Sequence, residues 1–131
     1  MRRRAILLAL IAIIAGSASA IWFFYGSPFD PFDDKRFSPE IWRTANEDLR
    51  ARMCRDAIRR FIHPGLNESE VITLLGSPTD VQQDERRDRP IGTRSYRYWI
   101  GSWSFQGMDD AFLYVHFDSE GRVVRAEIYG Y

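Results

Sequence analysis

The chain has 131 residues, with 18 basic and 18 acidic side chains and a formal net charge of zero. Without the three arginines at positions 2–4, 15 basic residues face 18 acidic ones, and they are scattered among the acids, which excludes bulk nucleic-acid binding. The length leaves room for one small domain of about 100 residues behind an N-terminal segment, and for no second core.

Residues 1–25 are typical of an export signal, because arginines at 2–4 precede a long apolar run. As a signal anchor, the 21 residues of 5–25 are close to the length that spans a bilayer, with Trp22 and Tyr25 at the interface. We favour this inner-membrane anchor, with the domain facing the periplasm or the exterior. As a cleavable signal peptide, the same segment would be cut after Ala20 and the domain secreted to the periplasm.

Residues 26–45 contain two Pro-Phe-Asp copies and are expected to form a linker, followed by a short helical turn that starts at Ser38 and Pro39. The aromatic side chains of the linker either lie on the domain or stay solvated. The domain itself is expected over residues 46–131.

A first amphipathic helix is expected from Asn46 to Ile62, because apolar residues recur at spacings of three and four. Cys54 falls in the apolar arc and is expected to be a small buried residue. The arginines of the opposite arc are expected to be solvated, with anionic lipid or an acidic partner as the alternative.

A second helix follows in "GLNESEVITLLGSP", where Asn67 and Glu70 predict a capping box and Gly76 and Pro78 predict the end of the helix. The glycines flank this helix and are not grouped ahead of it, so the pattern is not that of a phosphate-binding loop. Residues 79–92 are charged and aperiodic and are expected to form a long exposed loop.

Three runs rich in aromatic and β-branched residues, "TRSYRYWI", "AFLYVHF" and "RVVRAEIYGY", predict three antiparallel strands. For the last strand, a bulge at Gly121 would turn Val123 inward, and a plain loop would instead turn Val124, Ala126 and Ile128 inward. The sequence leaves that choice open. The expected inward residues of the other two strands are Tyr96, Tyr98, Leu113, Val115 and Phe117.

The opposite face of this sheet is expected to carry Trp99, Phe112, Tyr114 and His116, and it is too aromatic for a surface left in water. The loop "GSWSFQGMDD" adds further aromatic residues beside it. The candidate partner-binding residues are Trp99, Trp103, Phe105, Phe112 and Tyr114.

Sites for catalysis or metal binding are not indicated. His63, His116 and Cys54 have no spacing that resembles a zinc site, and no G-x-S-x-G motif is present. We therefore expect a protein that is not an enzyme, with no cofactor and no metal.

The motifs "PGLNESEVITLLGSPTD", "SYRYW" and "LYVHFDSEGRVV" resemble the SmpA/OmlA (BamE) family of small bacterial envelope domains, whose fold also occurs in β-lactamase inhibitor proteins. The likeness covers roughly residues 60–130. It implies a non-enzymatic envelope domain that binds other proteins or lipid. The matching residues are Gly65, Asn67, Val71, Leu75, Gly76, Pro78, Tyr96, Tyr98, Phe117 and Gly121.

These patterns predict an α+β fold with two helices packed on one face of a three-stranded antiparallel sheet. The leading hypothesis is a membrane-anchored module that binds a protein partner of unknown identity, linked to envelope or outer-membrane assembly. The alternative is an envelope structural component whose aromatic face is covered by Phe29 and Phe32 or by a second copy in a homo-oligomer. A small secreted hydrolase is the third hypothesis.

Overall fold

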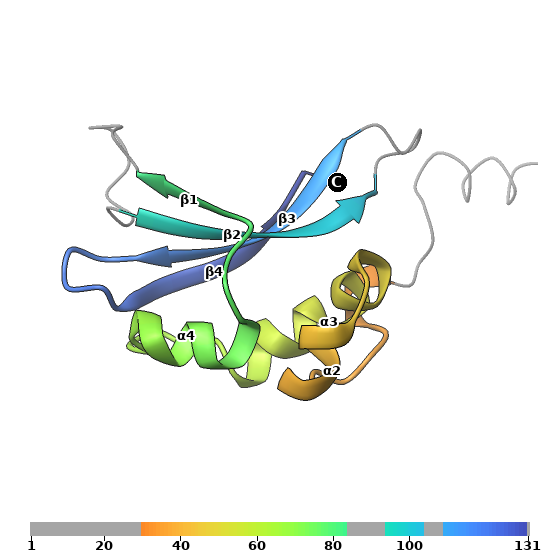
Figure 1. Cartoon of the computed structure of the whole chain (residues 1–131), viewed down its shortest axis with the longest axis horizontal. Coiled ribbons are helices and arrows are strands. Elements are labelled where there is room, and N and C mark those ends of the chain that lie inside the picture. The colour runs from red at the N-terminus through yellow and green to blue at the C-terminus, as the bar shows by residue number, and fades with distance from the viewer. Residues whose placement is uncertain (1–29, 84–93, 104–108, 131) are drawn as a thin grey trace, which may run out of the picture. The chain divides into compact units, whose positions relative to one another are not determined.

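An antiparallel sheet with helices on one face forms the domain, as Figure 1 shows. The computed structural model describes residues 30–83, 94–103 and 109–130, and all of these except Asp30 belong to the compact unit Pro31–Tyr131. The elements in chain order are η1 (Pro31–Asp33), α2 (Pro39–Thr44), α3 (Glu47–Arg60), α4 (Glu68–Leu75), β1 (Asp80–Gln83), β2 (Arg94–Ser102), β3 (Asp110–Phe117) and β4 (Val123–Tyr129).

The α+β class is confirmed, but the sheet has four strands in the described ranges, in the order β1-β2-β3-β4, and not three. The additional strand, β1, lies in the charged segment expected to be a loop. Its four residues are all exposed, so no alternation of apolar residues marks it in the sequence. It is held by its antiparallel pairing with β2. Asp80 lies opposite Arg97 and forms an ion pair with it at 3.0 Å.

The expected helices are confirmed, and each begins after a capping residue. The Asn46 side chain accepts from the Leu49 N–H at the start of α3, and the predicted capping box of α4 is formed by Asn67 and Glu70. Gly76 ends α4 with a φ of 75°, which favours glycine. Three α-helices occur in the part of the chain that the structure describes, since the turn expected after Ser38 is the helix α2.

The segment expected to be a linker supplies core residues. Phe32, Phe37 and Trp42 are 1%, 5% and 0% exposed, and the Trp42 indole N–H donates to the Leu75 carbonyl at 3.0 Å. The domain therefore begins at Pro31 and not at residue 46. The structural-component hypothesis placed Phe29 and Phe32 over the aromatic face of the sheet. Phe32 is instead buried in this core, and Phe29 lies outside the described residues.

The inner face of the sheet is confirmed, since all five expected inward residues of β2 and β3 are buried. In β4, Phe117 pairs with Val123 but His116 pairs with Arg125, so a bulge leaves Val124 without a partner in the register. Val123 consequently faces inward, and the later residues Ala126 and Ile128 also pack against the core. Each of the two expected registers thus holds for part of the strand.

The predicted signal anchor of residues 1–25 lies outside the described residues. Among residues 30–83, 94–103 and 109–130, no helix has the length and apolarity needed to cross a membrane.

Candidate functional site: the outer face of the sheet

The outer face of the sheet is the side that points away from α2, α3 and α4 (Figure 1). Cross-strand pairing arranges its side chains in rows, because paired residues point to the same side of a sheet. One row is Trp99, Phe112 and Tyr129. The next is Asp80, Arg97, Tyr114 and Glu127, and the third is Gln82, Ser95, His116 and Arg125.

The row of Trp99, Phe112 and Tyr129 is the most accessible aromatic part of this face. Trp99 is 36% and Tyr129 69% exposed, with Phe112 half-buried between them. The Tyr114 ring meets those of Phe112 and Tyr129 edge-on, at centroid distances of 6.3 and 6.1 Å. Aromatic side chains in such an arrangement offer a large contact area at a small cost in side-chain entropy, as protein interfaces require.

Arg97 covers part of this aromatic cluster from within the face. Its guanidinium carbon lies 4.0 Å from the Phe112 ring centroid and 5.5 Å from that of Tyr114, and the group pairs with Asp80 at 3.0 Å. The buried Nε has no hydrogen-bond partner among the described residues, which fits its position against the Phe112 ring. The charge of Arg97 is therefore compensated within the domain and does not point to an acidic partner.

His116 lies at the centre of a polar chain that joins three strands. Its Nδ1 is 2.7 Å from the Ser95 hydroxyl and its Nε2 is 2.9 Å from the Glu127 carboxylate, which also accepts from Arg125 at 2.7 Å. The imidazole stacks on Tyr114 with an interplanar angle of 18°. This chain depends on strand register, so the sequence alone did not show it.

A serine, a histidine and a carboxylate in one hydrogen-bonded chain resemble the parts of a hydrolase triad. Ser95 is only 5% exposed, however, and a nucleophile has to reach the carbonyl carbon of its substrate. In this arrangement the chain connects β2, β3 and β4, and we assign it a structural role.

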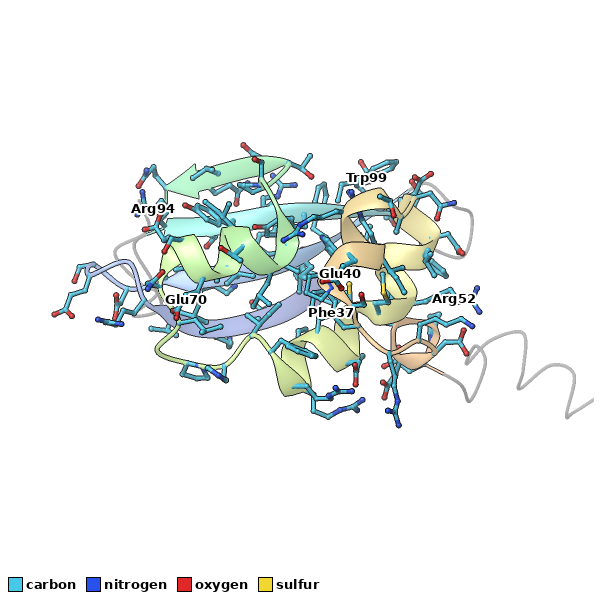
Figure 2. The ribbon with its side chains drawn as sticks, turned by 60° about the horizontal axis from the view of Figure 1, so that its bottom comes forward. Phe37, Glu40, Arg52, Glu70, Arg94 and Trp99 are labelled. Carbon is cyan, nitrogen blue, oxygen red and sulfur yellow. The ribbon has the colours of Figure 1, made fainter. Side chains whose placement is uncertain are left out.

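The five candidate partner-binding residues do not all lie on one surface. Trp99, Phe112 and Tyr114 come together on the outer face, and Figure 2 labels Trp99 at the margin of the molecule. Trp103 packs instead on Phe32, with ring centroids 5.3 Å apart, and donates to the Ile100 carbonyl at 2.6 Å. Phe105 lies outside the described residues.

The sequence analysis missed several residues of this face, and among them Arg97 and Tyr129 contact its aromatic rings. Both follow from strand alternation once β4 is in register, because Tyr129 lies opposite Phe112 and Arg97 opposite Tyr114. The Trp99 indole N–H donates to Asp110 at 3.1 Å, which fixes the ring at the border of the face.

Away from the outer face, the described residues include few groups that could bind a metal or act as a nucleophile. Within the described ranges, no cluster of three or more His, Cys, Asp or Glu side chains could hold an ion. Burial raises the pKa of the Cys54 thiol above its ordinary range, which makes it a poor nucleophile.

Comparison with known proteins does not identify a family for this chain. No family model matches the chain, and no curated protein matches it. A solved crystal structure described as the osmotically inducible lipoprotein OsmE is similar to it, with 22% sequence identity over 56% of this chain and 75% of that chain and a TM-score of 0.40. A similarity of this size carries no inference about fold or function.

Proposed function

We propose that this chain is a non-enzymatic, exported cell-envelope protein that is anchored by residues 1–25 and binds a protein partner through the outer face of its sheet. The observation that carries the proposal is the row of Trp99, Phe112 and Tyr129, which no helix of the described residues covers. An exposed aromatic patch with a polar surround is the usual mark of an interaction surface.

The charges around this row favour a partner with an apolar or aromatic surface. Arg97 pairs with Asp80, and Arg125 pairs with Glu127, so each cation of the pairs already has its counter-charge. Binding should therefore depend on burial of the aromatic rings and only weakly on salt concentration.

Export is supported by the sequence of residues 1–25, with its arginines and its long apolar run. The resemblance of residues 60–130 to the SmpA/OmlA family supports an envelope role linked to outer-membrane assembly. Export, the envelope role and the absence of enzymatic activity are all parts of the proposal.

The test is site-specific photocrosslinking in the native envelope. A photoreactive side chain at Tyr129 should capture one defined partner, and the same side chain at Ile72, exposed on α4, should not. The double variant Trp99→Ala with Tyr114→Ala should lose this capture. Its unfolding transition should show that the domain is still folded. If capture is unchanged in that folded variant, the outer face is not the binding surface.

Self-association is the second candidate, because Phe32 is buried in the core and no helix of the described residues covers the outer face, which a second copy could therefore bind. Light scattering over a range of concentrations separates the two candidates. A dimeric mass that becomes monomeric in the Tyr129→Ala variant would support self-association, whereas a monomer at all concentrations would support a different partner.

A further inference from the structure

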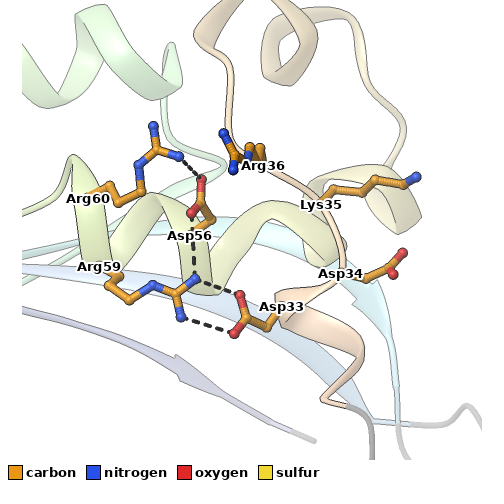
Figure 3. Close-up of a pocket in the computed structure, with 7 residues that line it drawn as sticks. All are labelled: Asp33, Asp34, Lys35, Arg36, Asp56, Arg59 and Arg60. Atoms are coloured by element: carbon orange, nitrogen blue, oxygen red, sulfur yellow. Dashed lines mark hydrogen bonds and ion pairs between the residues drawn. The ribbon is translucent and has the colours of Figure 1, made fainter.

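A hollow of about 440 Å³ lies between α3 and the segment that follows η1. It belongs to the helical side of the domain and shares no residue with the outer face. Arg52, a neighbour of the hollow, is labelled in Figure 2 at the end of the molecule opposite Arg94. All the residues that line the hollow are charged (Figure 3), namely Asp33, Asp34, Lys35, Arg36, Asp56, Arg59 and Arg60.

The first two carboxylates of the hollow are each paired with an arginine of α3. Asp33 accepts two hydrogen bonds from Arg59, at 2.8 and 3.0 Å, and Asp34 accepts from the Arg52 Nε at 2.7 Å. The hydrogen bond from Arg59 lowers the pKa of Asp33, so its negative charge is retained at neutral pH. Neither carboxylate is left to compensate a further cation.

Asp56, the third carboxylate, is buried and its oxygens are also engaged. It accepts from the Phe37 N–H at 2.8 Å and from Arg60 at 3.3 Å, with Arg59 at 3.5 Å. The backbone hydrogen bond from Phe37 is the main cause that lowers the pKa of Asp56, and burial opposes it. The negative charge of Asp56 is thus compensated inside the domain.

Lys35 and Arg36 are the two cations that remain. Both are exposed, and neither side chain makes an ion pair or a hydrogen bond with a described residue. In Figure 3, Arg36 and Arg60 lie on either side of Asp56, whereas Lys35 points away from them. Two guanidinium groups therefore face the same hollow. Arg36 is unpaired, and Arg60 contacts Asp56 at 3.3 Å and lies over the Phe61 ring, 5.1 Å from its centroid.

We propose that this hollow binds a phosphate group, held by the guanidinium groups of Arg36 and Arg60. Arginine presents several N–H donors in a planar fork that matches phosphate oxygens, and Arg60 keeps donors free beyond its contact to Asp56. Lys35 adds positive charge at longer range. A tetrahedral group with two or more free oxygens can bridge both arginines, and a phospholipid headgroup or a soluble phosphate supplies this same chemistry.

The test is an NMR titration of the full-length protein in a non-ionic detergent, with inorganic phosphate at constant ionic strength. Arg36→Gln should weaken phosphate binding at least tenfold. Lys35→Gln is the matched control, because it removes the same charge from the adjacent residue, whose side chain lines the hollow but points away from Arg36 and Arg60 (Figure 3). It should weaken binding less than threefold. Both side chains are exposed, so both variants should fold.

A saturable titration that Arg36→Gln weakens and Lys35→Gln largely preserves supports the site. Equal weakening by both variants, or shifts that never saturate, would mean general charge attraction and would overturn it. Mixed micelles with a phosphodiester lipid identify the source: lipid binding that depends on Arg36 indicates a headgroup, and phosphate binding without lipid binding indicates a soluble ligand. The outer-face variants should not change either titration, so this proposal and the proposed function fail separately.

Discussion

The two faces of the sheet carry similar aromatic residues but differ in how far these are exposed. On the inner face Tyr96, Tyr98 and Phe117 are at most 6% exposed and pack against the helical layer. On the outer face Trp99 and Tyr129 are 36% and 69% exposed, and no helix of the described residues packs on them. Aromatic content alone therefore does not distinguish a core from a binding surface.

The polar partners of the aromatic side chains make the difference. Inside, the Tyr98 hydroxyl donates to the Gly76 carbonyl at 3.1 Å, and burial raises the pKa of this phenol. Outside, Arg97 and His116 lie among the rings, and Arg97 pairs with Asp80 while His116 is hydrogen-bonded to Glu127. The inner tyrosines are hydrogen-bonded to the helical side of the domain, Tyr98 to the Gly76 carbonyl and Tyr96 to the Glu68 carboxylate. The outer aromatics are supported by groups of the sheet itself and keep surface for a partner.

The largest effect is expected from Trp42→Ala on the helical side. Trp42 is fully buried, and its loss removes a large apolar side chain and the hydrogen bond to Leu75. Urea unfolding should show a loss of about 3–5 kcal/mol, enough to unfold a marginal domain. A loss below about 1 kcal/mol would contradict the assignment of the former linker segment to the core.

A smaller loss of stability is expected from Asp56→Ala. Asp56 lies at the contact between α3 and the segment that follows η1. Without the carboxylate, the Phe37 N–H loses its acceptor in a buried position, which should cost about 2 kcal/mol in urea unfolding. Asp56→Asn keeps an acceptor oxygen there and should cost less. Equal losses for the two variants would mean that charge, and not this hydrogen bond, is the main contribution.

Acid should weaken the same contact. The pKa of Asp56 is lower in the folded protein than in the unfolded chain, so its stabilisation is complete above the unfolded value of about 3.9. It is lost as the pH falls through the folded pKa. The contribution of Asp56 to the free energy of unfolding should hence be constant from about pH 7 to 5 and decrease below about pH 4, so that the acid decrease is less steep in Asp56→Asn. If the pH dependence of the free energy of unfolding is unchanged in Asp56→Asn, Asp56 does not cause the acid sensitivity.

The smallest effect on stability is expected from Tyr129→Ala on the outer face. Since this side chain is 69% exposed, the free energy of unfolding should change by no more than about 0.5 kcal/mol. Partner binding, measured by pull-down, should in contrast decrease strongly. A loss of stability comparable to that of Trp42→Ala would show that the outer row belongs to the core and would end the distinction between the faces.

Local signals predicted much of this fold. The capping box of Asn67 and Glu70 marked the start of α4, and alternation in β2 and β3 identified the inner residues. The strand β1 could not be predicted, because Asp80–Gln83 has no buried residue and depends on its pairing with β2. Phe32 and Phe37 were ambiguous for a related reason, since proline-rich sequence around them carries no periodicity.

The candidate surfaces were predictable only in part. Trp99, Phe112 and Tyr114 follow from alternation along single strands, but Trp103 lies beyond the end of β2 and packs on Phe32. The charged hollow joins residues 33–36 to residues 56–60, and no motif in the sequence connects segments that meet through tertiary contacts. The same limit applies to the chain of Ser95, His116 and Glu127, which exists only once three strands are in register.

Cys54 gives the domain a built-in reporter of its own opening. The thiol is fully buried in α3, and its Sγ lies 3.3 Å from the Arg50 carbonyl. It is also the single cysteine of the chain, so a thiol-specific reagent has one target. Labelling can proceed only during excursions that separate α3 from the sheet. The labelling rate consequently measures how often the helical layer opens, and a partner bound to the far side of the sheet can be detected by the slowing of that rate.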